Sequence, residues 1–170
     1  MRGRVAALVL AGLGLVTACS DSDADSPDGA GGFREASCEL EGSASGQAAL
    51  VEEDDAFTVT WDGFGVPSSD RFDYSVQLAD EQGTRAQLLL VYQDGELAEH
   101  LVNVVGADFR QHDQETAPQV EGDRVTAVFA RDDDALTDLE VTQWHAAAYS
   151  RDLSVGGACT PEDEPFLPFP

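Results

Sequence analysis

Lysine is absent from the 170 residues, and nine arginines are the only basic side chains beside 33 acidic ones, which gives a formal net charge of −24. Nucleic-acid binding needs a basic stripe or patch to neutralise phosphates, so the missing cations exclude DNA and RNA as partners. The chain is 42% hydrophobic, which is too apolar for a wholly disordered protein. Its length is sufficient for one domain with a hydrophobic core.

Long hydrophobic runs are also missing. The longest apolar stretch, from Val5 to Val16, is broken by glycines and is too short to remain as a membrane-spanning helix. It follows Arg2 and Arg4 and ends in Val16-Thr17-Ala18-Cys19. This order of a basic start, an apolar run and small residues before a cysteine is typical of an export signal.

The Val16–Cys19 segment resembles the lipobox of bacterial lipoproteins. The resemblance implies that residues 1–18 are a signal peptide, that the Cys19 thiol receives a diacylglyceryl group, and that cleavage makes Cys19 the mature N-terminus. The protein would then be anchored in the cell membrane by lipid and face outside the cytoplasm. The alternative is an ordinary secretory signal in which Cys19 is incidental.

Residues 19–36 begin with a run that has no large apolar side chain, so we expect the lipidated cysteine to be followed by a flexible acidic linker. Asp21, Asp23 and Asp25 imitate the start of a calcium-binding loop. Ser26 and Gly32 stand where that loop needs Gly and Glu, so calcium is not expected there.

From residue 37 to residue 160 the hydrophobic pattern has a period of two, as in Phe57, Val59 and Trp61. Turn signals such as Asp94-Gly95 separate such runs, and no long helical pattern is present. These features predict an all-β fold, an antiparallel β-sandwich of about six to eight strands. Residues 161–170 are rich in proline and acid, which predicts an extended tail.

Cysteine is scarce, with three residues in the chain. The lipobox uses Cys19, which leaves Cys38 and Cys159 as an even pair in an oxidising compartment. They bracket nearly the whole β region, so we predict one disulfide that ties its ends together. The alternative is two unpaired thiols.

Motifs for catalysis are missing as well. His100, His112 and His145 are too far apart in sequence to form a local metal pair. Ala44 occupies the position in Gly42–Gly46 where a nucleophile elbow needs serine, and no phosphate-binding glycine loop occurs. We therefore predict neither enzymatic activity nor a cofactor.

Two sets of side chains are candidates for ligand binding. The first is the densest anionic cluster in the chain, Asp132, Asp133, Asp134 and Asp138, whose oxygens suit Ca²⁺ although their spacing matches no known calcium loop. We predict no metal site, and these residues are the ones to test. The second set is Trp61 and Trp144, which either stack on a sugar at the surface or belong to the core, the reading that we favour for Trp61.

The stretch from Arg124 to Pro161 resembles the C-terminal part of secreted bacterial β-sandwich domains of unknown function, loosely DOMON-like. The pattern is carried by Val125–Phe129, by Trp144 and by Cys159-Thr160-Pro161. Some members of that group bind haem or sugars. Met1 is the only methionine and is lost with the signal, so a Met/His haem pair cannot form here.

These observations predict a non-catalytic, lipid-anchored cell-envelope protein that acts as a binding or interaction module. Its acidity favours a basic protein partner. The alternative is a β-sandwich that binds a small ligand, either a carbohydrate or Ca²⁺. Adaptation to high salt would also explain the surplus of acidic residues without any partner.

Overall fold

The computed structural model of the chain describes residues 33–68, 70–105, 109–131, 136–160 and 166–170. The predicted signal peptide, Cys19, the linker up to residue 32, and Asp132, Asp133 and Asp134 lie outside the described residues.

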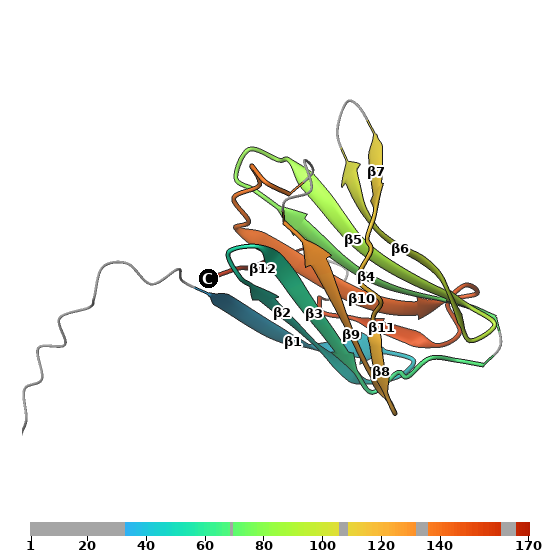
Figure 1. Ribbon diagram of the computed structural model, residues 1–170. Helices are drawn as coiled ribbons and strands as arrows, with labels where there is room; N and C mark the ends of the chain where they lie inside the picture. The colour runs from blue at the N-terminus through green and yellow to red at the C-terminus, as the bar shows by residue number, and fades with distance from the viewer. Residues whose placement is uncertain (1–32, 69, 106–108, 132–135, 161–165) are drawn as a thin grey trace, which may run out of the picture. The chain divides into compact units, whose positions relative to one another are not determined.

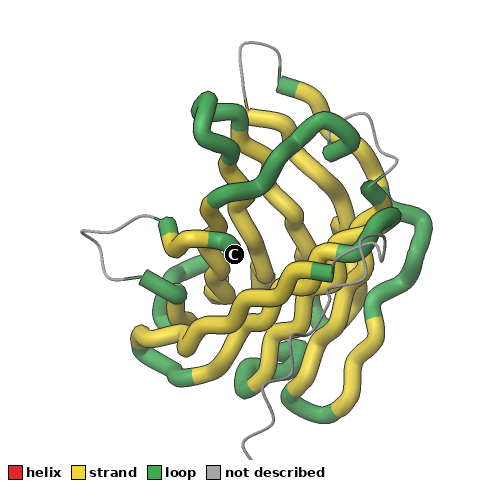
Figure 2. Tube along the Cα trace, turned by 90° about the vertical axis from the view of Figure 1, so that its left-hand side faces the viewer, coloured by secondary structure: helices red, strands yellow, loops and turns green. Residues whose placement is uncertain are grey.

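The described residues form twelve strands and no helix, as the tube in Figure 2 shows. Their bounds are β1 Arg34–Gly42, β2 Gly46–Glu52, β3 Ala56–Asp62, β4 Arg71–Ala79, β5 Arg85–Gln93, β6 Glu96–Val105, β7 Arg110–Asp113, β8 Gln119–Glu121, β9 Arg124–Ala130, β10 Gln143–Ser150, β11 Gly156–Ala158 and β12 Leu167–Pro168.

All strand pairs are antiparallel, and they join into one sheet in the order β7-β6-β5-β4-β10-β11-β1-β2-β3-β9-β8, with β12 added beside β10. The sheet curls into a half-barrel, so that β4, β5, β6 and β10 lie opposite β1, β2, β3 and β9 (Figure 1). The all-β antiparallel class is confirmed, whereas the predicted sandwich of six to eight strands is wrong.

The miscount has a physical reason. The strands β7, β8, β11 and β12 contain only two to four residues each. A period of two cannot be recognised over so short a run, because alternation needs about four residues to show. The strands β7 and β8 form the two edges of the sheet, β12 lies beside β10, and β11 connects the two halves. This connection joins the two layers that we expected into one curled sheet.

The connection between the two halves is made at the end of β1. Residues Arg34 to Leu40 pair with β2, whereas Glu41 and Gly42 pair with β11. A Cβ atom on Gly42 would collide with the backbone of Gly156, so glycine allows this close crossing.

The core lies inside the curl and is formed by one face of every long strand. Phe57, Val59 and Trp61 of β3 are fully buried there, as are Tyr74 and Leu78 of β4. The predicted disulfide is confirmed: Cys38 of β1 is bonded to Cys159, with 5.5 Å between their Cα atoms.

The register also defines two opposite ends of the sheet. At the first, which we call the entry end, the chain enters β1 at Arg34, opposite Glu52, and the β4–β5 turn follows Ala79. At the second, which we call the loop end, the β3–β4, β8–β9 and β10–β11 connections meet. The linker that would lead from Cys19 therefore joins the described fold at the entry end.

Both predicted boundary segments differ from the structure. The strand β1 begins at Arg34, inside the segment 19–36 that we assigned to the linker. In the segment 161–170, expected to be an extended tail, Leu167 and Pro168 pair with β10 and Phe169 is buried. The ring of Phe169 lies 4.7 Å from the Arg34 guanidinium, which holds the two termini of the domain together. Leu136–Asp138 forms a turn, with a hydrogen bond from Leu139 N to Leu136 O.

Candidate functional site

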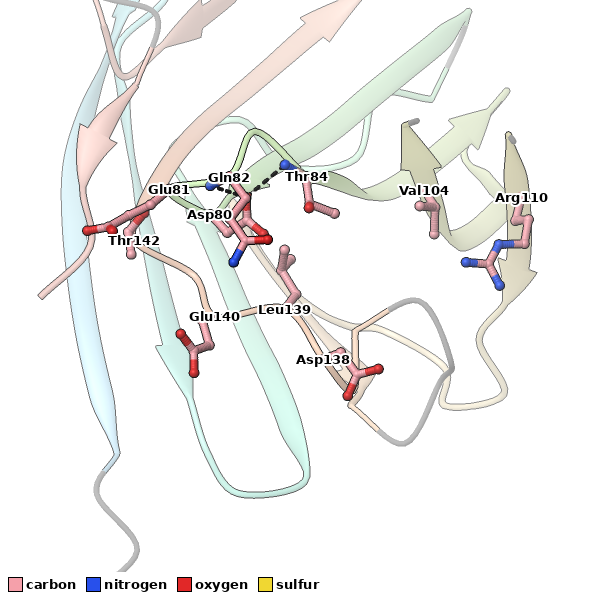
Figure 3. A pocket seen from close by; sticks show the side chains of 10 residues that line it. All are labelled: Asp80, Glu81, Gln82, Thr84, Val104, Arg110, Asp138, Leu139, Glu140 and Thr142. Atoms are coloured by element: carbon pink, nitrogen blue, oxygen red, sulfur yellow. Dashed lines mark hydrogen bonds between the residues drawn. The ribbon is translucent and has the colours of Figure 1, made fainter. Parts of the chain in front are cut away.

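A cavity of about 720 Å³ lies at the entry end, and four of its lining residues are acidic. Asp80 and Glu81 of the β4–β5 turn face Asp138 and Glu140 of the segment before β10, and Arg110 of β7 supplies the cation of the lining. Figure 3 shows Arg110 and Val104 on one side of this acid-lined pocket and Glu81 and Thr142 on the other.

The carboxylates of the acid-lined pocket do not converge. Asp80 uses its carboxylate in its own turn, where it accepts hydrogen bonds from the backbone N–H groups of Gln82 and Thr84 at 2.9 and 2.7 Å. Desolvation acts to raise the pKa of Asp80, but these hydrogen bonds outweigh it and lower the pKa. The carboxylates of Glu81, Asp138 and Glu140 point in different directions (Figure 3).

No group of three or more His, Cys, Asp or Glu side chains in the described parts of the chain is arranged to hold a metal ion. Asp138 lines the acid-lined pocket, and its three predicted companions Asp132, Asp133 and Asp134 lie outside the described residues. The prediction of no metal site, with these four residues as the ones to test for Ca²⁺, therefore stays a prediction.

A second cavity, of about 470 Å³, lies at the loop end and has a different chemistry. Its buried and half-buried lining residues, which we call the floor, are mostly apolar and include Phe64 and Phe72. Its exposed lining residues, which we call the rim, include Asp70, Asp123 and Asp152. We call it the loop-end pocket.

An aromatic cluster supports the floor of the loop-end pocket. Ring centroids are 6.1 Å apart for Phe64 and Phe72, 4.9 Å for Phe72 and Tyr74, and 5.4 Å for Tyr74 and Trp61. The buried Tyr74 hydroxyl donates a hydrogen bond to the carbonyl oxygen of Gly65, and burial raises the pKa of Tyr74. Tyr74 therefore stays neutral, and its hydrogen bond to Gly65 holds the β3–β4 connection against the aromatic cluster.

Hydrogen bonds fix one of the rim carboxylates. Asp152 accepts from the hydroxyls of Ser154 and Ser150 at 2.7 and 2.8 Å and from the Ser154 backbone N–H at 3.0 Å. The hydrogen bonds from Ser154 and Ser150 lower the pKa of Asp152 to about 2. The group is thus an oriented, ionised carboxylate at neutral pH.

Backbone strain gathers at the same end. The non-glycine residues with positive φ in the described segments are Asp70 (65°), Asp94 (53°) and Leu153 (58°), and all three lie in turns of the loop end. Asp70 and Asp94 brace each other, because Asp70 N donates to Asp94 Oδ1 and Asp94 N donates to Asp70 O. Such conformations persist where the surrounding structure holds them, and they are common at functional sites.

A third feature is a row of neutral polar side chains across the outer face of the half-sheet β10-β4-β5-β6-β7. The register places one residue of each strand side by side, in the order His145, Gln77, Gln87, Asn103 and Gln111. Asn103 donates to Gln87 Oε1 at 3.1 Å, while its own Oδ1 is buried without a hydrogen-bond partner. Burial lowers the pKa of His145, which keeps its imidazole neutral. We call this set the amide row.

The two tryptophans do not form a surface platform. Trp61 is 0% exposed and Trp144 is 1% exposed, and both belong to the core. Neither buried ring can stack on a sugar: the core role that we favoured for Trp61 is confirmed, and Trp144 is a core residue as well. His100 is also buried, in edge contact with Phe129 at 4.7 Å between ring centroids.

Comparison of the chain with protein-family models, with curated proteins and with solved structures found no match. In the described segments, no helix has the length and apolar character needed to cross a membrane.

Sequence reasoning missed the loop-end pocket and the amide row. The pocket residues are drawn from three connections that are far apart in sequence, and the row residues each look like ordinary outward positions of a strand. Strand register is what brings either set together, and no local pattern encodes it.

Proposed function

We propose that this protein is a non-catalytic, lipid-anchored binding module held outside the cytoplasm, and that it takes its ligand in the loop-end pocket. The observation that carries the proposal is the position of that pocket. It has an apolar, aromatic floor and a polar rim, as small-ligand sites do, and it opens at the end of the fold opposite to the point where the linker enters. An anchor at Cys19 would leave that end free.

The rim supports binding rather than acid–base catalysis. A general acid at neutral pH needs a carboxyl group whose pKa is raised, whereas the hydrogen bonds to Asp152 lower its pKa to about 2. Arg71, which also lines the pocket, is paired with Asp73 at 2.7 Å and with Glu99 at 3.5 Å.

The anchor is tested by expressing the full chain in a bacterium and measuring the mass of the N-terminal peptide from membranes. We expect a peptide that starts at Cys19 and carries acyl mass, and no such peptide from Cys19→Ser. A native chain that keeps its first eighteen residues without acyl mass would refute the anchor.

The binding site is tested with the lipidated chain in nanodiscs and three benzene derivatives, namely benzylamine, benzyl alcohol and benzoate. The readout is amide NMR shifts, with empty nanodiscs correcting for partition into lipid. We expect saturable shifts in residues 63–67, 122–123 and 150–155 with at least one compound. Binding confined to other parts of the chain, or none, contradicts the proposed site.

A second candidate function, carbohydrate binding, is favoured by the amide row. Amides and a neutral imidazole both donate and accept hydrogen bonds, as sugar hydroxyls do. Electrophoresis in gels that contain neutral polysaccharide (dextran, mannan or xylan) tests it. Gln87→Ala should lose any retardation that Gln47→Ala, on the outer face of β2, retains.

A further inference from the structure

We infer that the loop-end pocket selects a small organic cation, an amine or guanidinium group borne on an apolar body. The inference rests on the proposed function, because it names the ligand class of the same pocket. The inference follows from the aromatic floor of the pocket, the carboxylates of its rim and the negative electrostatic field of the whole protein.

The floor suits the apolar body and also the cation. The Phe64 ring is partly exposed at the pocket, and Phe72 lies beneath it with 6.1 Å between ring centroids. The face of an aromatic ring attracts a cation through its quadrupole, and the ring also buries apolar ligand surface. Gly46 makes this position possible, because a Cβ atom there would collide with the Phe64 ring.

The rim supplies the countercharge. Asp70, Asp123 and Asp152 line the pocket, and Asp152 is already oriented by three hydrogen bonds. The cation nearest to them in the lining, Arg71, is compensated by Asp73 and Glu99 on the outer face of the sheet. Arg151 borders the adjoining hollow with Asp70 and Asp152, so the carboxylates still outnumber the uncompensated guanidinium groups.

The volume of the loop-end pocket and the negative electrostatic field of the whole protein both favour an organic cation. A volume of about 470 Å³ lies within the usual range for small-molecule sites. A formal net charge of −24 raises the local concentration of cations and depletes anions around the whole protein. An anionic ligand would have to enter against both the rim and this field.

The three benzene derivatives separate the contribution of charge to binding from that of the aromatic ring, since they share one ring and differ in charge. We expect loop-end affinity to fall in the order benzylamine, benzyl alcohol, benzoate. The preference of benzylamine over benzyl alcohol should shrink when sodium chloride is raised from about 0.05 M to about 0.5 M, because salt screens exposed charges.

Three single substitutions test which side chains contribute to the binding of benzylamine. Asp123→Asn should weaken benzylamine by about two- to fivefold, the range of exposed ion pairs, and leave benzyl alcohol unchanged. Phe64→Leu should weaken both compounds. Asp138→Asn, which removes one carboxylate from the acid-lined pocket at the other end, is the matched control and should change neither.

The outcomes distinguish the inference from the proposed function. If benzyl alcohol or benzoate binds the loop end as tightly as benzylamine, the cation selectivity is refuted and the binding site stands. If none of the three compounds shifts a loop-end residue, or if they bind only at a site that Asp138→Asn abolishes, both are refuted.

Discussion

The Glu52 carboxylate is buried and forms ion pairs with two arginines. It lies on the inner face of β2, is 4% exposed, and accepts hydrogen bonds from Arg34 of β1 and from Arg131 after β9. Arg34 also donates to the carbonyl oxygen of Val141, and Arg131 lies over the Phe57 ring. Two of the few arginines of the domain thus stabilise the entry end through ion pairs with Glu52.

We predict that Glu52→Gln lowers the free energy of unfolding by about 2 kcal/mol, because two partly buried guanidinium groups lose their countercharge. Chemical denaturation measures the change. The neighbouring exposed Glu53→Gln is the control and should stay within about 0.5 kcal/mol of the parent. Equal effects of the two substitutions would mean that the pairing contributes nothing.

Leu153 shows strain at a single residue. It holds φ at 58° and is 69% exposed, so it has the cost of a left-handed conformation without the gain of burial. We expect Leu153→Gly to leave stability unchanged or to raise it by up to about 1 kcal/mol.

Leu97→Gly provides the comparison for Leu153, because Leu97 is also exposed but lies in strand β6 without a positive φ, beside the register shift between Val91 and Tyr92 of β5. Glycine there should cost about 1 kcal/mol, since strands disfavour it. Thermal melts of both variants decide the matter. A loss at position 153 as large as that at position 97 would show that no strain is stored there.

At the scale of the elements, the two-residue strand β12 docks the C-terminal segment. Backbone pairing over Leu167 and Pro168 is too short to hold a segment alone, so the buried ring of Phe169 must contribute most of the anchoring. Phe166 is only partly buried, against His145 and Arg85.

Phe169→Ala should therefore cost about 3 kcal/mol of unfolding free energy, and Phe166→Ala clearly less. The reason is that the first substitution opens a cavity in the core and removes the contact with Arg34, whereas the second trims a surface contact. Urea denaturation of both variants measures this. A tail that is free in solution would make both substitutions neutral.

The elements also show where sequence reasoning stops. Phe57–Trp61 was recognisable as a strand because alternation is a local signal, as is a turn such as Asp94-Gly95. The strands β7, β8, β11 and β12 were not, since each forms only where a partner strand offers its edge. The prediction of Trp61 as a core residue is confirmed for the same local reason, its phase with Phe57 and Val59.

At the scale of the whole molecule, charge and burial together set the response to pH. Burial lowers the pKa of His100 and His145 below the ordinary value of 6.5, although a backbone group of Thr116 partly opposes the shift for His100. The unfolded chain then binds more protons than the folded one just below pH 6.5. The stability that these groups contribute is complete above pH 6.5 and is lost as the pH falls toward their folded pKa values.

We predict that the free energy of unfolding decreases from pH 7 to pH 5 and that His100→Leu makes the decrease shallower. Asp152, with its pKa lowered to about 2, adds a second loss only below pH 4, as the pH falls through 3.8 toward 2. Denaturation midpoints across this range test the sign. A stability that rises on acidification to pH 5 would contradict the assignment.

What the sequence by itself determined are the properties that neighbouring residues carry: the acidity, the alternation of strands, and the pair Cys38 and Cys159 that forms the bridge. Only the tertiary structure decided that twelve strands curl into one half-barrel, that Phe64, Phe72 and Asp152 share a pocket, and that five amide and imidazole side chains share a row. The physical reason is register. Which residues lie side by side across a sheet depends on pairing between distant segments, and a shift of one residue would turn every one of those side chains to the other face.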